Sequence, residues 1–219
     1  MAKPRLEIAE EVAAKKAFAW VIEWPGWCRS GKDASLARDA LLAYAPRYAV
    51  VAKAAGLTLP AVDGAELDIV ESVGGGSGTE FGVPSAITDR DRRRVTSAEA
   101  KRLASIVEAA WIVFDGVAAK APAELRKGPR GGGRDRDKMV HHVTESDNYY
   151  ARELGIRLPE PDATDRKAVV AERRAVLDSL GTASDGSPLA DRKWTQRYAA
   201  RRIAWDALDH AWEMEDRSD

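Results

Sequence analysis

The stretch KWTQRYAARRIAWDALDHAWEMEDR, residues Lys193 to Arg217, reads as one long helix and decides how the rest of the chain is interpreted. At about 100° per residue, its polar side chains gather in one narrow wedge, and apolar residues cover almost everything else. Two interpretations of the wedge are open: it is the solvent face of the helix, or it faces another helix and carries a site. The residues of this polar wedge are Arg202, Asp206, Asp209, His210, Glu213 and Arg217.

Two members of the polar wedge have the spacing of metal ligands. Asp206 and His210 lie four residues apart, so their side chains stack on the same face of the helix. From successive turns they can bind one metal ion. Trp205 and Trp212 project from a different stripe of the same helix, and we expect both in core packing.

The composition sets limits on the partners of the chain. The 34 basic and 35 acidic residues nearly cancel, with a formal net charge of -1, so no global field attracts nucleic acid or an anionic membrane. The single cysteine, Cys28, forms no disulfide within the chain and no thiolate zinc site, and we expect it to be structural. The first sixteen residues lack the apolar core of a signal peptide, and no run of about eighteen apolar residues follows. We therefore expect a cytoplasmic protein with no membrane partner.

A β-hairpin is predicted near the start of the chain. Residues 18–22 alternate large and small side chains as in a strand, Pro25-Gly26 is a turn signal, and residues 27–29 continue as a second strand. Asp33 or Ser35 then caps a helix.

The same unit continues to about residue 90. Pro46 predicts a kink or break in the helix near Tyr48. Residues 66–73, and residues 79–87 after the glycine-rich GGGSG, predict one or two further strands. Residues 1–90 are therefore expected to form a small α+β module of the order β-β-α-β.

Residues 91–219 predict helices, each with one apolar stripe. Thr96 and Glu99 fit a capping box that begins the first of them. The second is predicted from about Asp135 to Leu154 and the third over residues 166–180, and the fourth is the segment quoted at the start. The expected fold class is α+β, with a C-terminal four-helix bundle as the second domain.

A glycine-rich basic loop, LRKGPRGGGRDRD, spans residues 125–137. It lacks the GK[ST] ending of a phosphate-binding P-loop, which argues against a nucleoside triphosphate site. The loop is either solvated, or a cationic rim that holds an anionic ligand near a helix N-terminus. Its candidate anion-binding residues are Arg126, Lys127, Arg130 and Arg134. Nucleic-acid binding through the same loop is disfavoured by the balanced charge.

Two histidines occupy the second turn of the second predicted helix. His142 lies at the edge of the apolar arc, where it can line a cleft between helices, whereas His141 points about 100° away among charged residues. A histidine at the edge of a core is either a hydrogen-bonded structural residue or a metal ligand. We expect His141 to be solvated.

The segment GGRDRDKMVHHVTESDNYYARELG, followed some fifty residues later by RRIAWDALDHAWEMEDR, resembles the DinB/YfiT-like metalloprotein superfamily over Thr96 to Arg217. The resemblance implies a divalent metal held by a histidine of the second helix and an H-x-x-x-H pair of the fourth. On this sequence the three positions are His142, Asp206 and His210. Asp206 departs from the family pattern, giving a set of two histidines and one carboxylate suited to zinc, nickel, iron or manganese. The same departure also allows a site that has lost its metal.

The resemblance also implies what such a site does. Some members of the family act on small molecules, so the expected activity is that of a transferase or hydrolase on a small thiol or thiol conjugate. Glu145, Tyr149 and Glu213 are candidates for supporting the ligands or transferring protons. Members of the family often pair through their bundles, and the tryptophan stripes allow a homodimer.

A second resemblance covers Phe18 to Gly56. An apolar strand, an acid, Pro25-Gly26, three residues, Ser30-Gly31 and an alanine-rich amphipathic helix follow one another, and this pattern resembles the HicB-like antitoxin fold. It implies a β-β-α-β arrangement and a protein-binding sheet. It does not imply an antitoxin, because no DNA-binding segment is visible. The alternative function is therefore a non-enzymatic protein-interaction module on a helical platform.

Overall fold

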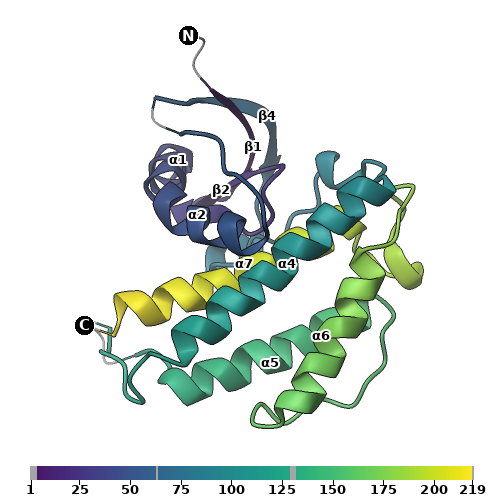
Figure 1. Ribbon diagram of the computed structural model, residues 1–219. Helices are drawn as coiled ribbons and strands as arrows, with labels where there is room; N and C mark the ends of the chain where they lie inside the picture. The colour runs from purple at the N-terminus through teal and green to yellow at the C-terminus, as the bar shows by residue number, and fades with distance from the viewer. Residues whose placement is uncertain (1–3, 63, 129–131, 219) are drawn as a thin grey trace.

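The computed structural model describes residues 4–62, 64–128 and 132–218, and these form a mixed α+β protein (Figure 1). One four-stranded sheet lies near the N-terminus, and seven α-helices accompany it among the described residues. The strands are β1 (Arg5–Val12), β2 (Ala17–Val21), β3 (Cys28–Gly31) and β4 (Glu66–Gly74). The helices are α1 (Ala34–Ala43), α2 (Ala45–Ala54), α3 (Ser77–Phe81), α4 (Ser97–Ala118), α5 (Arg136–Glu153), α6 (Arg166–Leu180) and α7 (Gln196–Asp216).

The sheet has the strand order β3-β2-β1-β4. Neighbouring strands β1, β2 and β3 are antiparallel, whereas β4 returns parallel to β1 with an irregularity between Ile8 and Ala9. The predicted hairpin is β2 and β3, joined through Pro25-Gly26. The predicted order β-β-α-β is wrong in one respect: it omits β1, the strand between β2 and β4 in the sheet.

Of the one or two strands predicted over residues 66–73 and 79–87, the first forms as β4 and the second does not form. Residues 77–81 form the short helix α3. In the segment that follows, backbone N–H groups donate hydrogen bonds to the side chain of Glu11 and not to a neighbouring strand. Glu11 accepts hydrogen bonds from the Thr79 hydroxyl at 2.5 Å and from the backbone N–H groups of Ser85 at 3.2 Å and Ala86 at 3.0 Å. This buried carboxylate takes backbone donors that a strand ladder would otherwise use.

The helix breaks and starts follow from local chemistry. Asp33 caps α1 by accepting a hydrogen bond from the Leu36 N–H at 2.9 Å. The predicted break at Pro46 is confirmed, but it falls at Tyr44 and not near Tyr48: α1 stops at Ala43, and α2 begins at Ala45 with the proline in its first turn. The predicted capping box of α4 is also confirmed.

The four longer helices contact one another in pairs. α4 packs against α7 and α6, and α5 packs against the same two helices. α7 also lies against the sheet, where the Trp205 ring meets Phe18 edge to face with 6.0 Å between ring centroids. Trp205 and Trp212 are 5% and 2% exposed, which confirms that both are core residues.

The turn before β3 fixes the sheet on α7. Gly26 has φ +86°, and a Cβ atom there would lie 2.9 Å from the Cβ of Ala204. One large apolar cluster therefore runs from Leu6 in β1 to Met214 in α7. This cluster includes residues from both predicted domains, 1–90 and 91–219, which therefore share one core. The division into two domains stays a prediction.

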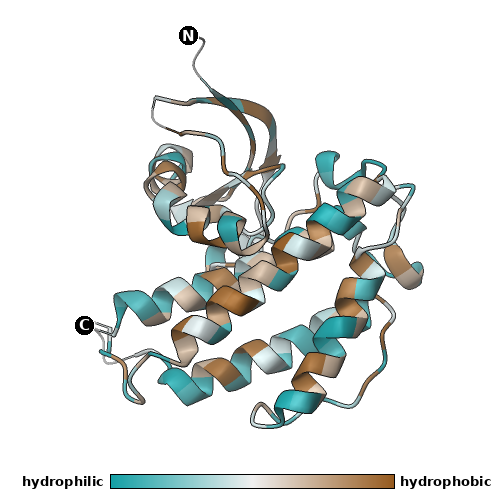
Figure 2. Ribbon diagram, viewed as in Figure 1, coloured by the Kyte–Doolittle hydropathy of each residue, from teal (hydrophilic) through white to brown (hydrophobic). Residues whose placement is uncertain are grey.

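Apolar and polar residues alternate around the helices, as the bands in Figure 2 show. The apolar stripes face the shared core, and polar residues lie on the outer turns. Within the described ranges, none of the helices combines the length and the apolar character needed to cross a bilayer.

Candidate functional site

α5 and α7 bring two of the predicted ligands into contact. The imidazole rings of His142 and His210 meet edge to face, with 5.0 Å between their centroids. Further along the pair, Tyr150 of α5 contacts Trp194, just before α7, at 5.2 Å between ring centroids. Later residues of α5 thus meet earlier residues of the α7 segment, and the two helices run antiparallel.

The centre of the polar wedge of α7 is buried rather than turned to water. Arg202 and Asp206 are only 8% and 5% exposed, so the solvent-face interpretation is wrong for the centre of the wedge. Towards the C-terminus, Asp209 pairs with Arg29 of β3 at 2.7 Å, and His210 is partly buried. Buried charges of this kind require partners, so we expect the side chains of the wedge to be held by specific polar contacts.

Asp206 occupies the buried part of this layer. Its Oδ1 accepts a long hydrogen bond of 3.4 Å from Arg202 Nη1, and its Oδ2 is buried with no hydrogen-bond partner among the described residues. Burial raises the pKa of Tyr150, and the charge of Asp206 and a side-chain hydrogen bond to this carboxylate add to the rise. A buried carboxylate oxygen without a partner is rare and has unused capacity to bind a cation or a donor.

His210 is held by acidic neighbours. Its Nδ1 lies 3.4 Å from Glu213 Oε2, an ion-pair contact without hydrogen-bond geometry, and Glu213 also accepts a 2.5 Å hydrogen bond from Arg217. Burial by itself lowers the pKa of His210, but the contact with Glu213 and the charges of Asp206 and Asp209 raise it overall. A carboxylate on one ring nitrogen also orients an imidazole whose other nitrogen binds a metal.

His142 has the opposite electrostatic environment. Burial lowers its pKa, and the positive charges of Arg134 and His210 lower it further, against the opposing effect of Asp206. His142 is therefore held in the neutral form, which is the form that coordinates metals. The two touching rings thus have pKa values shifted in opposite directions.

The residue types at this site fit a divalent ion in part. Two imidazoles lie together, and a carboxylate with an orphaned oxygen lies one helical turn away on α7. Over residues 4–62, 64–128 and 132–218, however, no three His, Cys, Asp or Glu side chains are already grouped around one point. Asp206 is turned towards Arg202, so a third protein ligand requires this side chain to rotate.

The three candidates for supporting roles lie in different surroundings. Glu145 faces solvent and pairs with His141 Nδ1 at 3.2 Å, and His141 is itself exposed as expected. Tyr149 is 58% exposed, and its ring leans on Tyr150. Of the three candidates, Glu213 is the one in contact with a predicted ligand.

The candidate anion-binding residues also separate. Arg126 donates to the backbone carbonyl of Asp216 at 2.6 Å, and Lys127 pairs with Asp135 before α5. Arg130 lies outside the described residues. Arg134 is exposed, and its charge reaches His142. Arg126 therefore links the loop to the end of α7 by a hydrogen bond, while the charge of Arg134 lowers the pKa of His142.

A second buried polar group was missed at the sequence level. Asp147 accepts hydrogen bonds from Trp111 Nε1 at 3.1 Å and from Arg173 Nε at 3.2 Å, and Arg173 also reaches Asp115 at 3.0 Å. Burial raises the pKa of Asp147 to about 7, and the charge of Asp206 adds to the rise. The available signal was an acid four residues after Val143 on the apolar arc of α5, where a core residue is expected.

Comparison of the chain with models of known protein families, with curated proteins and with solved structures gives no match. The two family resemblances therefore stay predictions. The geometry between α5 and α7 is the basis for a functional proposal.

Proposed function

We propose that this protein binds a divalent metal ion between α5 and α7, with His142, His210 and Asp206 as its protein ligands. The contact between the two imidazoles carries the proposal, because it joins residues that lie far apart in the sequence. The orphaned Oδ2 of Asp206 supports the third position. In this proposal α4 to α7 form a DinB-like four-helix bundle, and the site lies between two of its helices.

The surrounding residues have distinct tasks in the proposed site. The environment of His142 keeps its ring neutral and ready to coordinate, whereas His210 must lose a proton when it binds the ion. Glu213 then orients the His210 ring through Nδ1. Arg202, whose Nη1 lies 3.4 Å from Asp206 Oδ1, would compete with the ion for that carboxylate.

We further propose a reaction class for the same site. Three protein ligands leave positions open on a divalent ion, and a bound ion acidifies a coordinated water or thiol near neutral pH. Transfer to, or hydrolysis of, a small thiol or its conjugate is the reaction that the DinB/YfiT-like resemblance favours. Zinc, nickel, iron and manganese all accept this ligand set.

Metal content tests the binding proposal. Protein without a histidine tag is loaded in turn with zinc, nickel and manganese, desalted and subjected to elemental analysis. We expect about one ion per chain in the wild type and a loss of metal in His142→Ala and His210→Ala. His141→Ala is the matched control, since this neighbouring imidazole is exposed and pairs with Glu145. An equal loss in all three variants, or a metal-free wild type, would refute the site.

One observation favours a second candidate, the protein-interaction module. β4 forms one edge of the sheet in the described chain, and its Ile69 is 46% exposed. A partner could add a strand along such an edge. Because the core is shared with α4 and α7, deleting residues 1–90 is no clean test. A specific partner recovered by wild type and by His142→Ala, but lost in Ile69→Lys, would support this candidate, whereas recovery by Ile69→Lys would refute it.

A further inference from the structure

α4 has an exposed ridge opposite its buried face. Glu108, Ile112 and Gly116 of α4, and Lys120 in the turn two residues beyond its end, follow one another at intervals of four residues, and all four are exposed. Ile112 is 55% exposed, which is unusual for an isoleucine in the middle of a helix of 22 residues. We call these four residues the α4 ridge.

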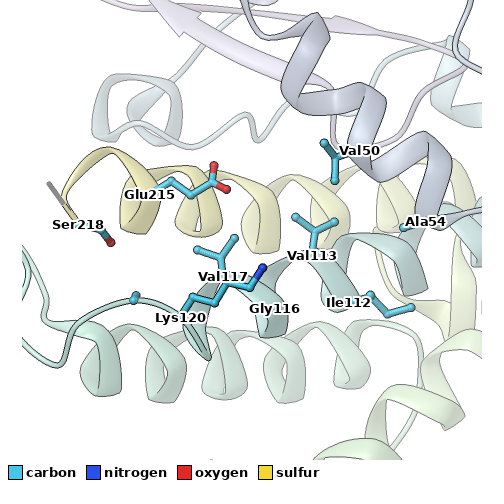
Figure 3. Close-up of a pocket in the computed structure, with 10 residues that line it drawn as sticks. Val50, Ala54, Ile112, Val113, Gly116, Val117, Lys120, Glu215 and Ser218 are labelled. Carbon is cyan, nitrogen blue, oxygen red and sulfur yellow. The ribbon is translucent and has the colours of Figure 1, made fainter.

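The α4 ridge stands between two grooves. A groove of about 500 Å³ lies between α2, α4 and the end of α7, where Val50 faces Val113 and Val117 (Figure 3). A second groove of about 220 Å³ lies between α4 and α6, where Val170 is 55% exposed. Ile112 lines both grooves, so the apolar surface is continuous across the ridge.

The exposed aliphatic side chains of Val50, Ile112 and Val170 therefore lie on α4 and its flanks. The tryptophans of α7 are buried in the core and are not free to join two molecules. Any contact between copies must use another face. Grooves on both sides of a ridge give a surface that is both convex and concave. A twofold-symmetric dimer needs such a self-complementary surface, because the same patch of both copies forms the interface.

We propose that a second copy of this chain covers the α4 ridge, with the two α4 helices antiparallel about a twofold axis near Phe114. Glu108 and Lys120 are each six positions from residue 114 in the sequence, with Lys120 in the turn just after α4, and Ile112 and Gly116 are each two positions from it. The twofold axis therefore sets Glu108 of one copy opposite Lys120 of the other, and Ile112 opposite Gly116. Each pair occurs twice, once on each side of the axis.

Both pairs are complementary. A Cβ atom on Gly116 would meet nothing within 4 Å, so the glycine leaves a notch beside the ridge. The Ile112 side chain of the second copy fits such a notch as a ridge fits a groove. Glu108 and Lys120 form no ion pair among the described residues, and both are free to pair across the axis. Complementary charges that exchange under a twofold rotation favour a second copy over an unrelated partner.

A charge exchange tests the interface by sedimentation velocity over a range of protein concentrations, in buffer with a chelator. Glu108→Lys and Lys120→Glu each place like charges opposite one another twice, so each should weaken dimerisation at least about tenfold. The double variant Glu108→Lys/Lys120→Glu restores opposite charges and should restore the dimer. Lys101→Glu is the matched control, because it changes charge on the exposed side of α4 outside the ridge.

Three results would overturn the proposal: a wild type that is monomeric at every concentration, a double variant no better than the single variants, or a dimer that survives Ile112→Asp. Circular dichroism melting of each variant separates a lost interface from a lost fold. If one single variant fails to fold, the other and Ile112→Asp still decide the question. The proposal is independent of the metal site, since the histidine pair lies between α5 and α7 and does not touch the ridge.

Discussion

The rings of His142 and His210 touch edge to face at 5.0 Å between centroids, and their surroundings shift their pKa values in opposite directions. Burial and Arg134 favour a neutral His142, whereas Glu213, Asp206 and Asp209 favour a protonated His210. Neighbouring groups with separated pKa values are typical of sites that exchange protons or bind metals. The contact joins α5 to α7.

The first prediction concerns pH. His210 has a folded pKa above its ordinary value of 6.5, so its protonated form stabilises the fold at pH below that value. This contribution is lost as the pH rises through the folded pKa. The difference in unfolding free energy between wild type and His210→Gln should therefore be largest on the acidic side and shrink towards alkaline pH. Urea unfolding of metal-free protein between about pH 5 and 8 measures it.

His142→Gln provides the contrast. The folded pKa of His142 lies below its ordinary value of 6.5, so its contribution to stability is present above that value and is lost as the pH falls. The two variants should therefore show opposite trends with pH. Parallel trends would contradict the assigned environments.

The second prediction concerns the buried layer around Arg173. Its side chain is 9% exposed and pairs with Asp147 and Asp115, so Arg173→Ala removes the cation beside the buried Asp147, which keeps only the hydrogen bond from Trp111. We expect a loss of about 3–5 kcal/mol in unfolding free energy. Arg174→Ala removes a pair with Asp178 from a side chain that is 71% exposed, and should cost less than about 1 kcal/mol. Equal losses in urea unfolding would show that the buried pairing is unimportant.

The third prediction concerns the contact between the sheet and α7. Gly26 and Gly56 both have positive φ, at +86° and +70°, so alanine is strained at either position by about 1 kcal/mol. At Gly26 the new methyl group also meets Ala204 and Leu208 at 2.9 Å, whereas at Gly56 it meets nothing within 4 Å. Gly26→Ala should lose about 1–3 kcal/mol more than Gly56→Ala because of this overpacking. Thermal melts of the two variants give the comparison.

Local signals in the sequence were sufficient for much of the helical region. Thr96 and Glu99 predicted the start of α4, and the apolar spacing predicted α5 and α6 close to their observed bounds. The grouping of Asp206 and His210 on one face of α7 was also visible from spacing. Whether that face met solvent or α5 depended on how distant helices pack, and a single helix does not contain this information.

Long-range partners explain what was missed. β1 has the acids Glu10 and Glu11 in its second half, which breaks the apolar pattern of a buried strand. Glu11 is buried because residues more than sixty positions later donate hydrogen bonds to it. Asp147 was likewise overlooked because its partner Arg173 lies on another helix. A charged residue at a core position indicates that a buried partner exists, but the local sequence does not show which residue it is.

X-ray absorption at the zinc edge of zinc-loaded protein is the most direct test of a metal site at His142 and His210, because it counts the imidazoles bound to the ion. We predict about two imidazoles per zinc in the wild type and in His141→Ala, and a loss of bound zinc or of one imidazole in His142→Ala. Zinc bound without imidazole, or with the same imidazole count after His142→Ala, would contradict a metal site at His142 and His210.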